Sequence, residues 1–542
     1  MALNIADLYE HAADAFPDRT ALACGDKQFT FREVDERANR LAHYLAGIGV
    51  KPGDHVGVYA RNSVEAAETL LAVCKLRAVA VNINYRYVEN ELRYLLDDSD
   101  PVALVHDQQD SARVAAVADA APGLLGTVVI DDGSGAEIGT GVRYDDALAA
   151  GSPERDLPER SGDDVYIIYT GGTTGWPKGV MWRHEDIWRT LGGGIDFFTG
   201  EALADEWEQS RRGRESAGLV RLCAAPLIHG AAQVATLGAL FGGDTVVLTR
   251  RFDPHEAWRV IERHKVNVML VIGDAMARPL IEAYRDGDYD ASSLVSLSSS
   301  AALFSPVVKE ACAAALPNVF ITEAIGSTET GFAGMGLVTA GAEQRGGPTV
   351  KPGPEVVVLN DEGGLAGPGE VGRLARGGHV PLGYYKDPVK TAAMFTELDG
   401  QRYAVPGDWA RVETDGSVTL LGRGNTCVNS GGEKVFPEEV EGALKSHPGV
   451  FDALVIGVPD ETLGQRVAAL VQAREDTPVD LDQLISHVRA EIAGYKVPRS
   501  IWLVDSIGRT AAGKADYGWA QRYVAAHPPS LGRPAGASQP AH

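Results

Sequence analysis

The sequence predicts an α/β protein with a large N-terminal domain of layered, mostly parallel sheets that includes a β-rich subdomain, followed by a small, mobile α+β domain. Three observations predict this. Helical periodicity alternates with short apolar strands in residues 5–100 and again from residue 245 to residue 302. Turn residues become closely spaced between residues 351 and 421, which indicates short antiparallel strands. A polar, glycine-bearing stretch around residues 425–434 then reads as a hinge before a compact remainder.

The first hundred residues justify the layered α/β part. Residues 31–45 place apolar side chains at helical spacing on one face, and Pro52–Gly53 follows as a stop signal. Apolar strands at residues 55–60 and 78–83 enclose a second helix. We therefore expect a large domain at residues 1–425, a small domain at residues 426–526 and a disordered, Pro- and Gly-rich tail at residues 527–542.

A glycine-rich loop follows one buried strand. The apolar run at residues 165–168 predicts that strand, and the Gly- and Thr-rich sequence at residues 169–179 cannot continue it. Glycines let successive backbone N–H groups point into one concavity, and Lys178 adds a cation, which together suit a phosphate. An ordinary glycine-rich turn is the alternative. A P-loop does not fit, because Gly179 rather than Ser or Thr follows Lys178.

Three later segments carry related signals. His229 follows a proline within an apolar run, where a packed core histidine is the commoner interpretation. Small residues at 296–302 permit the close approach of a flat ligand or relieve crowding. In the segment 322–331, the Glu329 carboxylate beside Thr328 suits Mg²⁺ against phosphate oxygens, although a helix N-cap with an acidic first turn fits equally.

Polar segments further along the chain have two readings each. Asp408 suits the hydroxyls of a ribose, or alternatively an Asx-type turn. The arginine-bearing segment 199–216 is interpreted as a solvated loop insertion in preference to a lid. Near the C-terminus, residues 508–514 form a loop that presents Lys514.

Composition excludes several classes of protein. The chain of 542 residues is 45% hydrophobic and 23% charged, as folded soluble proteins are. Its net charge of −24 argues against nucleic-acid and anionic-membrane partners, which need basic surfaces. The five cysteines form no C-x-x-C pair, no leader-like N-terminus is seen, and no apolar run approaches the length of a membrane span. We expect a cytoplasmic protein with reduced thiols.

Seven motifs occur in a fixed order: YTGGTTGWPKGV, APLIHG, AIGSTETG, GYYKDPVKTAAMF, PGDWA, LGRGNTCVNSGGEKVFPEEVE and RTAAGK. In this order they resemble the adenylate-forming superfamily of acyl-CoA synthetases, adenylation domains and luciferases, from about residue 5 to residue 523. Within it, YTGGTTG, KVNVMLVIGDAMARPL and EIAGYKVPRS look like actinobacterial fatty-acid and steroid CoA ligases.

The resemblance implies an ATP- and CoA-dependent acyl-CoA ligase that activates a bulky hydrophobic carboxylic acid, a steroid side-chain acid, through an acyl adenylate. Alternatives are a general medium- or long-chain fatty acyl-CoA ligase, and an acyl adenylate donor to a carrier protein. ATP, Mg²⁺ and coenzyme A are the implied cofactors and co-substrates. The resemblance leaves open whether the protein forms a homodimer.

The resemblance also implies roles for individual residues. The catalytic residues are Lys514, Glu329, Thr328 and His229, with His229 at the entrance of the acyl pocket, and Glu329 and Thr174 are the Mg²⁺ ligands. The phosphate cradle is formed by Thr170, Gly171, Gly172, Thr173, Thr174, Gly175 and Lys178. Adenine and the acyl carboxylate are bordered by Ser300, Ala301, Ala302, Ala324, Ile325, Gly326 and Ser327. Asp408 binds the ribose with Arg423 nearby, and Gly431 and Gly432 line the pantetheine tunnel.

Two positions depart from the family pattern. Many relatives have an aromatic residue where Ile325 stands, so the contact with adenine is expected to be aliphatic here. The usual hinge aspartate or lysine corresponds to Thr426.

Overall fold

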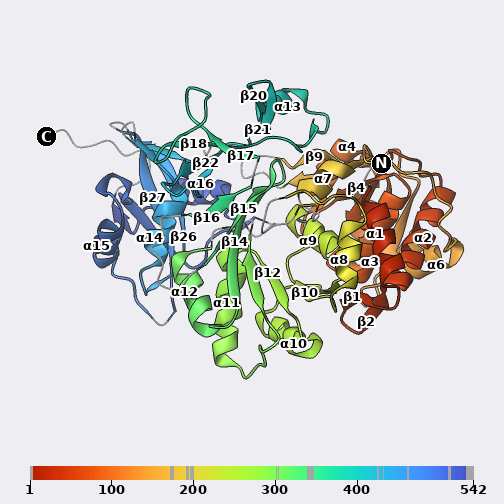
Figure 1. Cartoon of the computed structure of the whole chain (residues 1–542). Helices are drawn as coiled ribbons and strands as arrows, with labels where there is room; N and C mark the ends of the chain where they lie inside the picture. The colour runs from red at the N-terminus through yellow and green to blue at the C-terminus, as the bar shows by residue number, and fades with distance from the viewer. Residues whose placement is uncertain are drawn as a thin grey trace.

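The computed structural model describes residues 4–170, 176–190, 194–195, 201–300, 302, 304–338, 347–353, 355–423, 426–430, 433–460, 463–475, 477–510 and 514–532. The N-terminal helices and the small C-terminal domain lie at opposite ends of the molecule (Figure 1). A β-rich subdomain lies between them. The α/β fold class expected from the sequence is confirmed.

The largest sheet in the described part of the chain has fifteen strands. Its first strand, β2, is antiparallel to β1, and the six strands from β1 to β14 in the order below are parallel to one another. The strands of the β-rich subdomain that follow are antiparallel. In order across the sheet they are β2 (Lys27–Thr30), β1 (Thr20–Cys24), β11 (Thr245–Leu248), β10 (Val220–Cys223), β12 (Val268–Val271), β13 (Ser296–Ser299), β14 (Phe320–Ser327), β15 (Gly331–Leu337), β16 (Thr349–Pro352), β23 (Val418–Arg423), β22 (Asp408–Val412), β18 (Val371–Arg376), β21 (Gln401–Ala404) and β20 (Phe395–Leu398), with β17 (Val356–Leu359) beside β18.

A second sheet contains eight strands among the described residues. All but the first two run parallel. They are, in order, β19 (Gly383–Tyr384), β9 (Lys178–Arg183), β8 (Val165–Thr170), β4 (Val79–Asn82), β3 (His55–Tyr59), β5 (Pro101–Asp107), β6 (Gly126–Ile130) and β7 (Val142–Arg143).

Helices join the two sheets through one main apolar core, which contains side chains from β3 and β8 of one sheet and from β10, β11 and β12 of the other. The helices of this part are α1 (Ile5–Ala15), α2 (Phe31–Gly47), α3 (Val64–Lys75), α4 (Glu89–Ser99), α5 (Ser111–Ala116), α6 (Tyr144–Ala150), α7 (His184–Thr190), α8 (Glu208–Arg214), α9 (Gly230–Phe241), α10 (Pro254–His264), α11 (Gly273–Asp286), α12 (Pro306–Ala315) and α13 (Pro388–Met394).

Local sequence explains where the expected helix at residues 31–45 begins. The Thr30 hydroxyl accepts a hydrogen bond from the Glu33 backbone N–H, and the Glu33 carboxylate accepts one from the Thr30 N–H, which is a capping box. The helix continues to Gly47, two residues further than its apolar pattern. The neighbouring expected strands also form, as β3 and β4.

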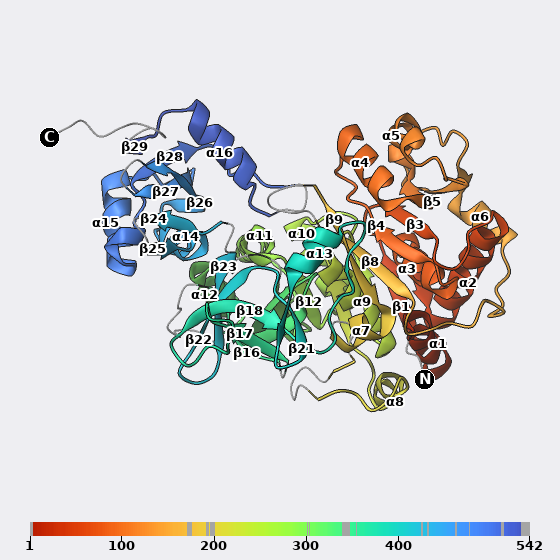
Figure 2. The same cartoon turned by 90° about the horizontal axis from the view of Figure 1, so that it is seen from above.

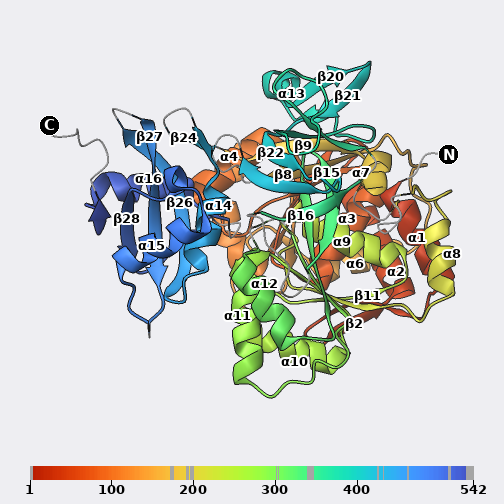
Figure 3. The ribbon, with the colours of Figure 1, turned by 60° about the vertical axis from the view of Figure 1, so that its left-hand side comes forward.

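The small domain has its own sheet and two apolar cores, one on each face. Figures 2 and 3 show it on the side of the molecule opposite α1 and α2. Its elements are β24 (Val428–Ser430), β25 (Glu433–Val435), α14 (Pro437–Lys445), β26 (Val450–Asp460), β27 (Gly464–Ala473), α15 (Leu481–Glu491), β28 (Ser500–Val504), α16 (Tyr517–Ala526) and β29 (Leu531–Gly532).

The chain after α16 differs from the disorder that the sequence predicts from residue 527. Leu531 and Gly532 form β29 and pair with Ile501 and Ser500 of β28. The unpaired edge of β28 thus supplies backbone hydrogen-bond partners, which the composition of residues 527–542 cannot predict. Residues 533–542 lie outside the described part of the chain.

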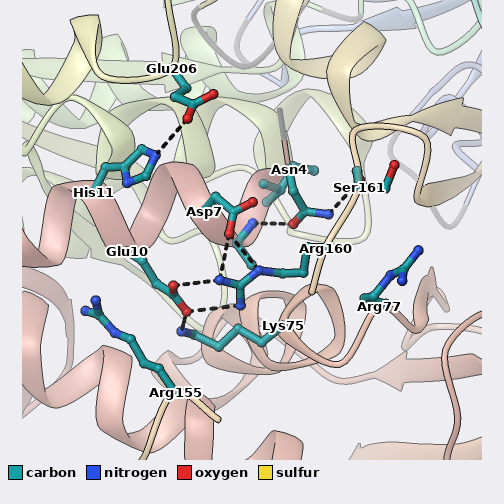
Figure 4. Close-up of polar contacts among 12 residues, drawn as sticks. Asn4, Asp7, Glu10, His11, Lys75, Arg77, Arg155, Arg160, Ser161 and Glu206 are labelled. Atoms are coloured by element: carbon teal, nitrogen blue, oxygen red, sulfur yellow. Dashed lines mark hydrogen bonds and ion pairs between the residues drawn. The ribbon is translucent and has the colours of Figure 1, made fainter. Parts of the chain in front are cut away.

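A network of buried charges ties three N-terminal helices together, and Figure 4 shows the part of it around Glu10, Lys75 and Arg160. The fully buried ammonium of Lys75 on α3 lies 2.5 Å from the Glu10 carboxylate of α1 and 2.8 Å from that of Asp35 on α2. Arg160 contacts Glu10 and Asp7 at 2.6 Å each. Burial alone would raise the pKa of Glu10, but Lys75 and Arg160 outweigh burial and lower it. The network therefore fixes the three helices as one unit.

None of the described helices combines the length and the low charge that crossing a membrane requires.

His184 begins α7 and is fully buried. Its Nδ1 accepts a hydrogen bond of 3.3 Å from the Ile5 backbone N–H, a role that only the neutral ring can fill. Burial lowers the pKa of His184 from 6.5 to about 4. Because the folded pKa is the lower one, the stabilisation is fully present above pH 6.5 and is lost as the pH falls toward 4.

We expect His184→Asn to flatten this pH dependence. The amide oxygen of Asn can accept the Ile5 N–H but does not titrate, so between pH 7 and pH 4.5 the variant should lose about 2–3 kcal/mol less unfolding free energy than the wild type. Urea denaturation at several pH values measures this. The surface variant His255→Asn is the control, and equal pH slopes in wild type and His184→Asn would contradict the assignment.

Candidate active site

A cavity of about 1690 Å³ lies where the two large sheets and the small domain meet. It exceeds the roughly 300–1,000 Å³ of an ordinary ligand pocket, which suggests that it holds more than one molecule. Thirteen of the predicted site residues line it. They are Thr170, Lys178, His229, Ser300, Ala302, Ala324, Ile325, Gly326, Ser327, Thr328, Glu329, Asp408 and Lys514.

The predicted phosphate loop connects two antiparallel strands. Thr170, the last residue of β8, is the cross-strand partner of Lys178, the first residue of β9. The loop therefore leaves and re-enters the sheet at one point, so Lys178 is held at its base. Of the other predicted site residues, Gly171, Gly172, Thr173, Thr174, Gly175, Ala301, Gly431 and Gly432 lie outside the described residues.

Asn82, at the end of β4, holds the base of this loop and was not singled out from the sequence. Its amide accepts from the Tyr169 backbone N–H at 2.7 Å and donates to the Tyr169 carbonyl at 3.0 Å. It also donates to the Ile228 carbonyl at 2.6 Å, next to His229. The signal that could have found it is a lone amide at the end of an otherwise apolar strand.

Glu329 lies in the turn between β14 and β15 and is linked to Lys178 through one tyrosine. The Tyr384 hydroxyl donates to Glu329 Oε1 at 3.1 Å, and Lys178 Nζ lies 5.0 Å from the centre of the Tyr384 ring. Tyr384 comes from β19, which pairs with β9 immediately after Lys178. One tyrosine thus has a cation over its ring and a carboxylate at its hydroxyl group.

The segment 322–331 is a strand and turn, so the alternative of a helix N-cap is wrong. Strand β14 runs to Ser327 and pairs with β15. The Ser327 hydroxyl accepts from the Thr330 backbone N–H at 3.1 Å, and the Thr328 carbonyl accepts from the Trp182 indole at 2.9 Å. These bonds fix the turn that presents Thr328 and Glu329 to the cavity.

His229 follows β10 and is the N-cap residue of α9. Its backbone carbonyl accepts from Gln233 N–H at 3.1 Å. The Gln233 side chain in turn donates to the Leu227 carbonyl at 2.7 Å. His229 lines the cavity, so it is placed for contact with a ligand and is not simply packed in the core.

Ser300 and Ala302 follow β13, and Ala324 and Gly326 lie on the neighbouring strand β14. Ile325 also borders the cavity, but it is 5% exposed and belongs to the apolar core of the β-rich subdomain. An aliphatic side chain here therefore has a packing role in addition to any contact with a ligand.

Asp408, the first residue of β22, and Arg423, the last residue of β23, are cross-strand partners. Gly407 precedes Asp408 with φ of +98°, a conformation that glycine adopts readily and other residues rarely do. The register therefore brings the two expected ribose-binding residues together, and Asp408 lines the cavity.

The small domain supplies Lys514 to the cavity wall and contacts α11 of the large domain. Lys445 Nζ lies 3.7 Å from Asp274, and Arg474 lies 3.4 Å from Glu282. Burial disfavours the Lys445 ammonium, but the carboxylates of Asp452 and Asp274 outweigh burial and raise its pKa. These ion pairs hold the small domain in the position that directs Lys514 to the site.

The segment 199–216 contributes to the cavity, so its interpretation as a solvated loop insertion is wrong in part. It forms the short helix α8, whose Gln209, Arg212 and Gly213 line the cavity. Gly213 packs against the Gly242 carbonyl at a distance that a Cβ atom would not tolerate. A sequence pattern of polar residues cannot show such tertiary contact.

Magnesium fits the donor set as a partner of a nucleotide. No group of three or more His, Cys, Asp or Glu side chains suited to a metal occurs in the part of the chain that the structure describes. Glu329 is a carboxylate in the cavity. Mg²⁺ is often held by one or two carboxylates together with substrate phosphates and water, so one such residue suffices.

Two family descriptions match the chain: AMP-binding enzyme at residues 9–385, and AMP-binding enzyme C-terminal domain at residues 439–514. It is 54% identical over 538 residues to a 3-oxocholest-4-en-26-oate–CoA ligase of Rhodococcus rhodochrous, covering 97% of both chains. It is also 54% identical over 533 residues to a medium/long-chain-fatty-acid–CoA/3-oxocholest-4-en-26-oate–CoA ligase of Mycobacterium tuberculosis, again covering 97% of both.

Solved structures share the fold over almost the whole chain. An anthranilate CoA ligase in complex with anthranoyl-AMP superposes with a TM-score of 0.82 at 24% identity, covering 96% of this chain and 97% of that one. ATP-bound MatB from Rhodopseudomonas palustris superposes with a TM-score of 0.80 at 25% identity, covering 96% and 99%.

We expect Tyr384→Phe to weaken ATP binding in the presence of Mg²⁺ by about fivefold, because removing the hydrogen bond that orients Glu329 costs about 1 kcal/mol. Isothermal titration calorimetry measures this affinity. Tyr385→Phe is the matched control, since the Tyr385 hydroxyl donates to Asp100 at 3.1 Å on the exposed surface and does not line the cavity. Equal affinities of the two variants for ATP would contradict the role of Tyr384.

Proposed function

Because the chain belongs to the family of AMP-binding enzymes, we propose that it is an acyl-CoA ligase that activates a hydrophobic carboxylic acid with ATP and transfers the acyl group to coenzyme A. The observation that carries this proposal is that Lys514 of the small domain lines the same cavity as Lys178, Glu329 and Asp408 of the large domain. Such an arrangement suits a reaction between two anions.

The first half-reaction joins the acid to AMP. A carboxylate oxygen of the substrate forms a bond to the α-phosphorus of ATP, and the bond to the bridging oxygen of pyrophosphate breaks. Negative charge develops on that oxygen, so preorganised cations stabilise the transition state. Lys178 at the base of the phosphate loop stabilises the negative charge of the departing pyrophosphate. Lys514 contacts the substrate carboxylate and the α-phosphate, and the Thr328 hydroxyl donates a hydrogen bond to the α-phosphate.

Nucleotide and metal are bound around these groups. Asp408, with Arg423 opposite it across the strands, accepts hydrogen bonds from the ribose, and residues 300–302 and 324–327 border adenine. Mg²⁺, held by Glu329 and Thr174, would neutralise charge on the phosphate oxygens. The Tyr384 hydroxyl keeps the Glu329 carboxylate oriented toward that position.

The second half-reaction transfers the acyl group. The thiolate sulfur of coenzyme A attacks the acyl carbonyl carbon, and AMP leaves with the bonding electrons and receives the proton that the thiol released. The thiol must approach the acyl carbon through the part of the site that Lys514 occupies, so the small domain must move between the two steps. Thr426 lies at the start of the small domain as the pivot, and Gly431 and Gly432 line the path of the pantetheine.

The acyl substrate that we propose is a steroid side-chain acid such as 3-oxocholest-4-en-26-oate, with medium- and long-chain fatty acids also accepted. Two relatives at 54% identity over 97% of the chain carry these substrates in their names, which supports this assignment. One methylene changes discrimination by only about 1–3 kcal/mol in an apolar pocket, so tolerance of chain length is expected. The reaction is assigned to the cytoplasm.

The proposal is tested by incubating the protein with ATP, Mg²⁺ and coenzyme A together with each of 3-oxocholest-4-en-26-oate, palmitate and decanoate. Mass spectrometry should detect AMP and the acyl-CoA in equal amounts for accepted acids. AMP without consumption of coenzyme A would overturn the ligase assignment. Equal efficiency with palmitate and the steroid acid would overturn a steroid preference.

Replacing Lys514 separates the two half-reactions. Lys514→Ala should reduce acyl adenylate formation by about 100-fold or more, because the developing charge loses its cation, while thiolysis of a supplied acyl adenylate stays near wild type. Stopped-flow or quench assays of each step measure this. Lys496→Ala is the control in the same domain, because Lys496 pairs with Glu439 and does not line the cavity. Equal loss in both steps would contradict the proposed role.

A further inference from the structure

The cavity continues past the nucleotide residues along the parallel strands of the largest sheet. Residues from both ends of these strands line it, with Gly326 near the carboxyl end of β14 and Phe320 at its amino end. A strand rises about 3.3 Å per residue, so Phe320 and Ser327 lie about 23 Å apart along β14. The cavity is therefore long enough for an extended acyl group that lies along the sheet.

Small side chains line the middle of this path. Ser296 and Ser298 on β13, and Thr322 and Ala324 on β14, follow each other at a spacing of two and so share one face of the sheet. Helix α9 adds further small residues, namely Ala235, Gly238 and Ala239. A wall of small residues leaves room for a flat, rigid ring system, whereas a thin alkyl chain does not need it.

A cationic side chain, that of Arg221, lines the far end of the path. Arg221, Val268, Ser296 and Phe320 are successive partners across β10, β12, β13 and β14, so Arg221 lies level with the amino end of β14. All four line the cavity. Arg221 is therefore about 26 Å along the strands from the turn that presents Thr328.

Asp244 fixes the Arg221 guanidinium through one of its N–H groups and leaves the others available. The Arg221 Nε donates to Asp244 Oδ2 at 2.6 Å, and Asp244 Oδ1 accepts from the Leu219 backbone N–H at 2.8 Å. A guanidinium has five N–H groups, so four besides Nε–H are available for other acceptors. The position of the guanidinium is thus set by Asp244, while its terminal nitrogens can meet a ligand.

The far end also reaches the surface. The Arg221 side chain is 38% exposed, and Phe320 on β14 and Leu337 on β15, at the same edge of the sheet, are 62% and 63% exposed. Water can therefore satisfy Arg221 when the ligand has no acceptor, so an alkyl tail is tolerated there. A hydrogen bond to a charged group at such a half-exposed place contributes less than a buried one.

We propose that Arg221 is a specificity-determining residue that donates a hydrogen bond to an oxygen acceptor at the end of the acyl group farthest from the carboxylate. The inference rests on the proposed acyl-CoA ligase function and deepens it. The ligand class that fits is a long, flat polycyclic acid with a ketone on its distal ring, as in a 3-oxo steroid side-chain acid. A saturated fatty acid fills the same path without that contact.

The test compares kcat/KM, measured by AMP release, for 3-oxocholest-4-en-26-oate, cholest-4-en-26-oate without the ketone, and palmitate. The wild type should prefer the 3-oxo acid over its 3-deoxy analogue by about tenfold. Arg221→Leu should erase this preference by lowering kcat/KM for the 3-oxo acid alone. Arg221→Lys, which retains a cationic donor, should keep part of it.

Arg259→Leu is the matched control, because Arg259 forms an exposed pair with Glu256 on α10 and does not line the cavity. Unchanged turnover of palmitate by Arg221→Leu shows that the variant is folded. The inference is overturned if the wild type does not distinguish the two steroids, if Arg221→Leu keeps the preference, or if it lowers all three substrates equally. Absence of AMP formation with every acid would instead overturn the ligase function on which the inference rests.

Discussion

The parallel alignment of β10, β12, β13 and β14 is the constraint on which the rest of the structure depends. Parallel strands bring their carboxyl ends to one edge of a sheet, so the segments that follow them meet there. His229, Ser300 and Thr328 come from three such segments and line one cavity. The same strands also set the long direction of the cavity, so the reacting end and the far end of the acyl path are two edges of one sheet.

The second constraint is electrostatic. A chain of net charge −24 repels the polyanionic nucleotide at long range, so attraction must come from cations held close to the phosphates. Lys178 is held by strand pairing within the large domain, whereas Lys514 comes from the small domain. Ion pairs between α11 and the small domain, such as Asp274 with Lys445, connect the domain that carries Lys514 to the large domain.

Tyr384 and Asn82 show how supporting residues differ from the groups that touch ligands. Tyr384 links the Lys178 ammonium and the Glu329 carboxylate, and Asn82 links the ends of two strand-to-loop connections. A lone amide at the end of an apolar strand marks Asn82, and Tyr384 lies in one of the seven motifs, but neither signal shows which groups the side chain contacts. Their importance follows from register, which places β19 beside β9 and β4 beside β8. Register depends on partners that are distant in the sequence.

By itself, the sequence determined the fold class and the family, and it named thirteen of the residues that line the cavity. Periodicity and turn chemistry are local properties, and seven motifs in a fixed order carry family information that no single one carries. The tertiary structure decided which polar segments reach the cavity. It made the segment 322–331 a strand and a turn, and it brought α8 to the cavity wall. It also paired Leu531 with β28 and placed Arg221 at the far end of the cavity. Those outcomes depend on contacts between remote segments, and no local pattern encodes such contacts.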